Sequence, residues 1–444
     1  MNRFVFKRII IILLLLSPSR SFADGDAGQA GEFLRYGVGA RALGMGRAFT
    51  AVADDATAIY WNPGGLIGLE DYRVDGMLMY SELYEKSAVY YVSGAISLKF
   101  VLELLKKADS QHFLINDLRN WSLGFAWLQL TSAGFEYRDQ FNNPNVSGNK
   151  TFCFSERALL FAIARSVKPF NQELGIGLCA KHLSQGWSDL PGSVSNGDGS
   201  GTGWDLGIRF TPGFLPSFAK VQFGFVLQNF NEPRIKFNSG AEDVIPKTDR
   251  FGIAIMPETE IRFLNSFLVS IDCDAKAPKG RDRNIYLGIE CDLIKIWPEI
   301  PVRLRLGSNT ANEKLSLGFS INLAQRNKIF SKKYLPRFDY AISKSKHDVE
   351  ALGWLEARIS LAISNPKRDK EYYEEAMLKF LLANSENPII AYEEYLRRYP
   401  DIKLKKRIKN KLIAEYEKII KKCPGTEKGN KAKKRVKELE SESR

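Results

Sequence analysis

The fold class of this 444-residue chain is decided by an alternating pattern that is clearest in residues 314–323, KLSLGFSINL. Leu315 and Leu317 fall on one side of an extended segment, and Ser316 and Gly318 fall on the other. Successive side chains of a β-strand point to opposite faces of the sheet. The pattern therefore predicts a strand with one apolar face and one face of small or polar residues.

The same alternation recurs throughout residues 72–364, which makes this region the body of the protein. We expect strands to begin near Tyr72, Ser87, Asn120, Glu156, Gln172, Gly203, Lys220, Thr248, Asn265, Arg283, Ile300, Lys314, Pro336 and Leu352. So large a sheet favours closure into a barrel. Most segments also reach the ~9–11 residues that a tilted membrane strand needs. The sequence predicts an all-β transmembrane barrel of about 14 antiparallel strands.

Connection lengths distinguish a membrane barrel from a soluble sandwich, which shows the same alternation within single strands. Long polar stretches follow odd-numbered strands, and shorter links follow most even-numbered ones. The long stretches are 132–155, 186–202 and 230–247, and the short links include 169–171 and 211–219. Bacterial barrels combine long outer loops with short periplasmic turns. The exception, 100–119, is partly helical, and we expect a short periplasmic helix there.

Residues 1–23 are predicted to be a secretory signal peptide. A basic start, Met1–Arg8, precedes the apolar run Ile9–Leu16, and Ser21 and Ala23 stand at the positions that signal peptidase reads. The eight-residue apolar run is too short for a membrane-spanning helix, which needs ~20 residues. An N-terminal anchor is the less favoured alternative. The protein is therefore expected to be exported, to the outer membrane of a Gram-negative-type bacterium.

The net charge of +13 does not indicate a nucleic-acid partner, because it is concentrated at the two ends. Residues 1–20 carry four basic and no acidic side chains, and residues 365–444 carry 22 Lys and Arg against 14 Asp and Glu. The remaining body is nearly neutral.

Residues 31–69 are not strand-like. They contain GVGARALGMG at 37–46 and AFTAVADDATAIYWNPGGL at 48–66. These patterns predict a glycine-rich turn, a short helix of small residues and an Asn-Pro-Gly turn. A dinucleotide-binding loop is disfavoured, because the third glycine has the wrong spacing and no apolar strand precedes it.

This segment closely resembles the PorV/PorQ family, a branch of outer-membrane barrels similar to the FadL long-chain fatty acid transporters. About thirty contiguous positions agree with the family pattern, which has small residues and alanine where this chain has Arg47 and Gly64. Residues 303–307, 315–319, 338–341 and 358–361 look like the closing strands of the family. The resemblance covers roughly residues 24–364.

The resemblance implies that residues 24–71 fold into the lumen of the barrel as a hatch. The candidate luminal residues of the hatch are Arg41, Asp54, Asp55, Asn62, Pro63 and Gly64. The wall charges expected to neutralise Asp54 and Asp55 are Arg209, Arg303 and Arg305. A plain helix cap or a solvated turn is the alternative for the two aspartates. Asn62 and Pro63 resemble the Asn-Pro turn of FadL-type hatches.

Residues 365–444 form a tail with helical periodicity. Helices are predicted at Glu371–Leu382, Ile389–Arg398, Leu404–Lys422 and Lys428–Glu440. YEEYLRRYP at 392–400 echoes YEKIIKKCP at 416–424, similar to the end of a degenerate tetratricopeptide repeat. We expect a basic periplasmic domain whose lysine-rich runs, Lys403–Lys411 and Lys428–Lys437, are solvated helix faces. The alternative is that these runs contact an acidic protein, a peptidoglycan-associated partner or lipid phosphates.

No catalytic residues, cofactor or metal site are predicted, and we expect the protein not to be an enzyme. His112, His182 and His347 lie far apart, and no metalloprotease, hydrolase or P-loop motif occurs. The five cysteines form no CxxC pair. Cys273 and Cys291 fall on neighbouring strands and could pair, although free apolar cysteines are favoured.

Two functions remain open, besides a purely structural role in the outer membrane. In the first, the barrel is a type IX-like partner or shuttle for secreted proteins, and its tail contacts secretion machinery or periplasmic proteins. The alternative is a FadL-like channel for hydrophobic small molecules. That alternative predicts an apolar pocket between hatch and wall and a break in the wall.

Overall fold

The computed structural model describes most of the barrel, the hatch and the last three helices. It covers residues 31–70, 74–84, 86–104, 117–136, 151–169, 172–188, 197–213, 219–257, 264–276, 283–293, 302–311, 313–322, 335–345, 355–364, 388–398, 405–422 and 424–441. The predicted signal peptide, the helix expected at 371–382 and most of the 100–119 connection lie outside the described residues. The structure does show a helix at the start of that connection, α4 (Leu98–Leu104).

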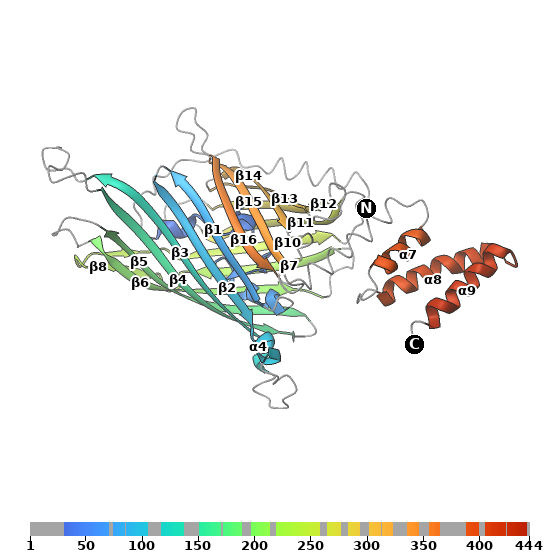
Figure 1. The fold of residues 1–444 in the computed structure, drawn as a ribbon. Helices are drawn as coiled ribbons and strands as arrows, with labels where there is room; N and C mark the ends of the chain where they lie inside the picture. The colour runs from blue at the N-terminus through green and yellow to red at the C-terminus, as the bar shows by residue number, and fades with distance from the viewer. Residues whose placement is uncertain are drawn as a thin grey trace. The chain divides into compact units, whose positions relative to one another are not determined.

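The strands form one antiparallel sheet that closes on itself (Figure 1). The ring contains β1 (Val74–Tyr84), β2 (Ser87–Ser97), β3 (Trp121–Glu136), β4 (Thr151–Val167), β5 (Glu173–Ser188), β6 (Gly199–Thr211), β7 (Ala219–Gln228), β10 (Thr248–Pro257), β11 (Leu264–Lys276), β12 (Ile285–Leu293), β13 (Val302–Asn309), β14 (Glu313–Asn322), β15 (Leu335–Ser345) and β16 (Leu355–Ser364). Strands adjacent in this order pair, and β1 pairs with β16. Over the described residues the ring therefore has fourteen strands, as predicted.

The sequence missed one hairpin. Two short strands, β8 (Arg234–Phe237) and β9 (Glu242–Val244), lie in the 230–247 stretch that was expected to be a loop. β8 pairs with the first two residues of β6, and Ile235 of β8 is buried. Strands of three and four residues are too short to show a period of two, so the pattern could not reveal them.

Burial in the ring is inverted relative to a soluble barrel. Outward side chains are apolar and exposed, such as Leu317 at 50% and Phe161 at 57%. Inward positions of the same wall hold buried charges, including Asp272, Arg305 and Asp339. An apolar exterior around a polar interior is the arrangement of a transmembrane barrel. The choice that single strands left open is thus decided in favour of the membrane.

Placing a charge on the outward face tests this arrangement. We expect Leu317→Arg to destabilise the folded barrel in lipid vesicles by about 2–4 kcal/mol, because an arginine must enter hydrocarbon. Urea unfolding followed by heat-modifiable gel mobility measures the change. Glu417→Arg on an exposed helix position is the matched control, with an expected change near zero. An unperturbed Leu317→Arg variant would show that this face is not in lipid.

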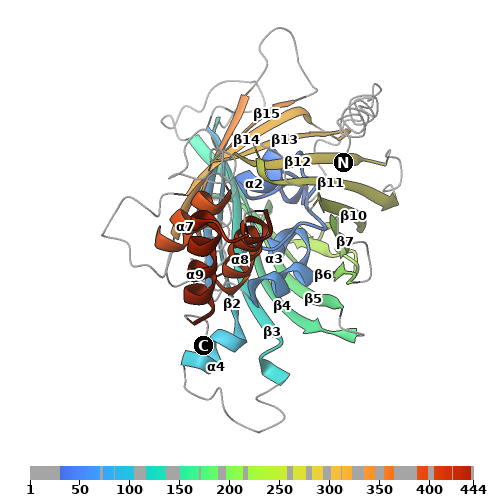
Figure 2. The same cartoon turned by 90° about the vertical axis from the view of Figure 1, so that its right-hand side faces the viewer.

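The hatch lies inside the ring, as Figure 2 shows for α2 (Ala40–Gly44) and α3 (Ala58–Trp61). Two further 3-10 helices belong to it, η1 (Glu32–Arg35) and η2 (Pro63–Glu70). The main hydrophobic core joins the hatch to inward side chains of the wall, such as Leu128 and Leu160. The hatch occupies the place that the resemblance implied.

The C-terminal unit contains three described helices, α7 (Pro388–Arg398), α8 (Lys405–Lys422) and α9 (Glu427–Ser441). They match three of the predicted helices. Tyr395 and Leu412 are fully buried in a separate hydrophobic cluster. Burial, and then a hydrogen bond to Glu393, raises the pKa of Tyr416 to about 12. The described part of the tail therefore has a core of its own.

No described helix is long and apolar enough to cross a membrane. Among the described residues, Cys153, Cys179, Cys273 and Cys291 are free thiols. The pairing of Cys273 with Cys291 that the sequence left open is therefore not formed.

Candidate functional site: the hatch and its seat in the lumen

The hatch is a chain of short helical turns made from small residues. Every residue of α2 is buried, and the turns around it have positive φ at Gly37, Gly39 and Gly46 and also at Arg47. Gly37 has φ 75° and Gly39 has φ 80°, conformations that side chains with a Cβ rarely adopt. Small residues and tight turns let the hatch backbone lie directly against the wall.

The wall meets the hatch with glycines at inward positions. A Cβ on Gly307 of β13 would lie 2.0 Å from the backbone nitrogen of Gly46. A Cβ on Gly207 of β6 would lie 2.2 Å from Oδ1 of Asn62. Similar contacts to hatch atoms, all closer than 3.2 Å, occur at Gly124, Gly175, Gly177, Gly224, Gly252, Gly288 and Gly318. These glycines line a seat that is shaped to the hatch.

Asn62, Pro63 and Gly64 form the turn that fits this seat on one side. The Asn62 amide donates to the carbonyl of Thr50 in the hatch (2.8 Å) and to that of Ile208 in β6 (2.9 Å). Its side-chain oxygen accepts from the Gly64 backbone N–H. A Cβ on Gly64 would lie 2.7 Å from the carbonyl oxygen of Gly207. Glycine at position 64 therefore allows direct backbone contact between the hatch and the wall.

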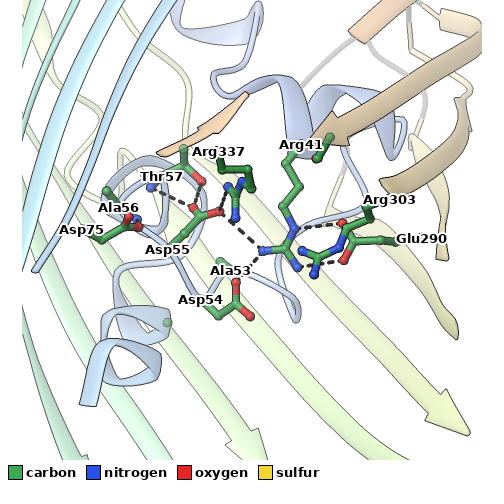
Figure 3. Close-up of polar contacts among 12 residues, drawn as sticks. Arg41, Ala53, Asp54, Asp55, Ala56, Thr57, Asp75, Glu290, Arg303 and Arg337 are labelled. Atoms are coloured by element: carbon green, nitrogen blue, oxygen red, sulfur yellow. Dashed lines mark hydrogen bonds and ion pairs between the residues drawn. The ribbon is translucent and has the colours of Figure 1, made fainter. Parts of the chain in front are cut away.

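Arg41 is the centre of a buried ion-pair network (Figure 3). Its Nε and Nη2 donate to the two carboxylate oxygens of Glu290 in β12, at 2.9 and 3.0 Å. Its Nη1 donates to Asp54 at 2.6 Å and to Asp55 at 3.4 Å. Bidentate arginine–carboxylate pairs fix geometry as well as charge. One side chain thus links two parts of the hatch to the wall.

The network continues around the wall through β13 and β15. Arg305 bonds Glu290 at 2.7 Å and lies 3.2 Å from Asp339. Arg337 bonds Asp339 at 2.7 Å and lies 3.7 Å from Asp55. Each buried carboxylate in this chain of contacts has a guanidinium partner, which offsets the cost of removing it from water.

Two arginines that were not among the expected wall charges pair with Asp54 and Asp55. The sequence assigned Arg209, Arg303 and Arg305, whereas the structure pairs the aspartates with Arg41 and Arg337. The three expected wall arginines also lie in the lumen, where each makes further contacts. Arg209 donates to the carbonyls of Ala53 and Gly65, Arg303 pairs with Asp292, and Arg305 pairs with Glu290 and Asp339.

Asp55 also bonds locally, although α3 has Thr57 as its N-cap and no side-chain cap hydrogen bond, so the helix cap given as an alternative is not formed. Its Oδ1 accepts from the Thr57 backbone N–H at 3.0 Å and from the Thr57 hydroxyl, just before α3. Its Oδ2 faces Arg41 and Arg337. The Asp55 carboxylate therefore takes part both in a local turn and in the ion-pair network.

Two wall aspartates that the sequence did not single out bind the hatch backbone. Asp272 of β11 accepts from the N–H groups of Phe49 and Thr50, at 2.9 and 2.7 Å. Asp75 of β1 accepts from the N–H of Ala56 at 2.6 Å. Both occupy inward positions of alternating strands, so acidic residues on the polar face were the available signal.

A cavity of about 100 Å³ lies between the first part of the hatch and the wall. It is lined by charged side chains, including Arg47, Lys181, Asp205 and Arg250, and by aromatic ones such as Tyr60. Lys181 pairs with Asp205 at 2.7 Å. This cavity is small and has both polar and apolar walls. It therefore differs from the apolar pocket between hatch and wall that a hydrophobic channel was expected to have.

The ladder between β6 and β7 is short. Five residue pairs join these strands, from Leu206↔Leu227 to Phe210↔Phe223. Beyond that ladder, the Trp204 carbonyl accepts from the Phe230 N–H, and Gly199 pairs with Phe237 of β8. The β8–β9 connection therefore completes the wall where the β6–β7 ladder ends.

The fold and the seat together define a class: a fourteen-stranded transmembrane β-barrel with a luminal hatch. No family model matches the chain, and no curated protein matches it. Among solved structures it is similar to a TodX monoaromatic hydrocarbon channel mutant (TM-score 0.42, 10% identity, 74% of this chain and 98% of the other). It is also similar to the CymD monoaromatic hydrocarbon channel (0.40, 13%, 74% and 96%) and to CdiB from Acinetobacter baumannii (0.36, 10%, 66% and 60%). These likenesses are too distant to carry an argument about function.

Proposed function

We propose that the protein is a hatch-gated transport barrel of a Gram-negative-type outer membrane, that it moves hydrophobic small molecules, and that it is not an enzyme. The observation that carries the proposal is the way in which the hatch is held. Besides the apolar core that it shares with the wall, it is bound there by ion pairs, hydrogen bonds and backbone contacts to glycine. Polar contacts of this kind can be exchanged for water when the hatch moves.

The size of the remaining space favours small cargo. With the hatch in place, the cavity beside it measures about 100 Å³, far below the ~300–1,000 Å³ of ordinary ligand pockets. Passage therefore needs a shift of the hatch, and a partial shift opens a path for a small molecule. A folded protein would require the whole lumen.

Uptake by whole cells tests the proposed cargo. Cells that make the protein should take up labelled toluene or oleate several-fold faster than cells with an empty vector. Glucose uptake through the same membrane should not change, which controls for leakage. Equal rates for the apolar solutes in both cell types would refute this cargo class.

A second candidate function is suggested by the C-terminal unit. Its helices have their own core, and α8 and α9 expose Lys411, Lys418, Lys433, Lys434 and Lys437. We propose a role as a secretion partner of PorV type, in which this basic unit faces the periplasm and binds an acidic protein. A passive channel does not need such a unit.

Pull-down from detergent-solubilised envelopes, with and without residues 365–444, tests the secretion role. We expect specific periplasmic or secretion-machinery proteins to be lost on deletion, while the barrel keeps its heat-modifiable mobility. The same set of proteins with both chains would count against a partner of the tail.

A further inference from the structure

A groove of about 610 Å³ runs across the outward face of β1 to β6. Every residue that lines it is apolar or glycine. Its depth comes from small outward residues, Gly94 and Ala180, set among Phe125, Phe161 and Trp204. A Cβ on Gly94 would meet nothing within 4 Å. The volume is that of a ligand pocket, and the groove opens onto the face that meets lipid.

The groove leads to a cationic side chain at one end of the barrel. The register of β3 and β4 places three pairs in succession along the groove, Phe125↔Phe161, Leu123↔Ile163 and Trp121↔Arg165. Residues two apart on a strand share a face, so all six side chains point outward. The side chain of Arg165 is 46% exposed, directly beyond the apolar ladder.

Arg165 is held in place rather than free to swing. Its guanidinium lies 5.4 Å from the ring of Trp121, and one nitrogen donates to Asp117. The indole of Trp121 donates to the other oxygen of Asp117 at 3.0 Å. An arginine has five N–H donors, so this arrangement leaves capacity for an anion. The exposed Lys99 and Lys168 follow at the same end of β2 and β4.

We propose that the groove and Arg165 together bind one phospholipid, with an acyl chain in the groove and the phosphate at Arg165. The apolar lining admits a hydrocarbon chain and offers a polar headgroup no partner. Tryptophan and arginine are side chains that anchor at the membrane–water boundary, and guanidinium binds phosphate oxygens in a forked geometry.

The apolar groove and the cationic Arg165 together favour a membrane lipid over other occupants. A free anion would not need the groove, and an uncharged hydrocarbon would not need Arg165. The site lies at the end of the barrel from which β1 starts and β16 ends. With the periplasmic placement proposed above for the C-terminal unit, this end of the barrel lies in the inner leaflet. The inference rests on the barrel and not on the proposed cargo.

Native mass spectrometry of the full chain, released from nanodiscs of phosphatidylglycerol and phosphatidylethanolamine, tests the site. We expect the wild-type chain to retain one phospholipid. Gly94→Phe fills the groove, and Arg165→Gln removes the phosphate partner. Each should lower the retained fraction at least tenfold. Ala180→Phe provides a second groove variant should Gly94→Phe fail to fold, as judged by heat-modifiable mobility.

Matched controls change the same kinds of residue elsewhere. Ile271→Phe alters an exposed outward position on β11, and Lys220→Gln removes an exposed charge at the start of β7. Both should retain lipid as the wild type does. Wild-type retention by a groove variant or by Arg165→Gln would overturn the proposal. So would equal loss in the controls, or the mass of two chains, which would show that a second copy covers the groove.

Discussion

Replacing Gly307 by valine is expected to drive the hatch out of its seat while the barrel remains folded. The new Cβ would lie 2.0 Å from the nitrogen of Gly46 and 2.2 Å from the carbonyl carbon of Met45. Both are backbone atoms, so no side chain can rotate away. Overpacking of this kind costs at least about 1–3 kcal/mol, and moving the hatch relieves it.

Trypsin reports the position of the hatch. Arg41 and Arg47 are buried when the hatch is seated, so cleavage after either residue requires release. We expect the cleavage rate in Gly307→Val to rise at least tenfold, together with new ion conductance in planar bilayers. Gly76→Val is the matched control, because its nearest neighbour would lie at an ordinary 3.6 Å. Continued protection of the hatch in a folded Gly307→Val barrel would contradict the close-contact model.

Replacing Arg41 by methionine is the second change with a large expected effect. It leaves Asp54, Asp55 and Glu290 without the guanidinium that joins them. Removing one partner of a buried ion pair typically costs about 3–5 kcal/mol, because the remaining charge stays desolvated. The equilibrium constant for release of the hatch should therefore rise by several orders of magnitude. The stability of the barrel wall should change little.

Amide hydrogen exchange of the hatch measures this loss directly. Amides of Phe49, Thr50 and Ala56, which bond to wall aspartates, should lose protection in Arg41→Met. Arg35→Met is the control, since its ion pair with Glu32 is partly exposed and worth about 0–1 kcal/mol. Equal protection in the Arg41 variant and in the wild type would show that the network does not hold the hatch.

The wall was predictable because its information is local. A period of two, repeated in segments such as 314–323, specifies strand and face without knowledge of any partner. The predicted strand starts lie within five residues of the observed ones. The β8–β9 hairpin was missed because strands of three or four residues are too short to show an alternating pattern. Its pairing with β6 depends on a tertiary contact that the sequence pattern does not reveal.

The seat was predictable only in outline. The aspartates of the hatch were identified, but their partners depend on which inward positions lie opposite in the closed ring. Arg337 and Glu290 are separated from Asp55 by more than 200 residues, and no local pattern links them. Gly64 illustrates the same limit. It read as a departure from a family pattern, and only the three-dimensional contact with Gly207 explains it.

The closure of the ring between β1 and β16 has a consequence for assembly. The hatch is made first, yet α2 packs against β13, β14, β15 and β16, the last strands to emerge. Gly76 of β1 likewise pairs with Ile363 of β16, so the ring cannot close until the last strand has been made. During export the hatch therefore has no complete binding surface, and its sequence must stay soluble without one. Contacts between such distant parts of a chain form slowly. A chaperone that binds the N-terminal segment until β16 has been made would protect the hatch during this interval. Deletion of the last strands should leave the hatch open to cleavage by periplasmic proteases.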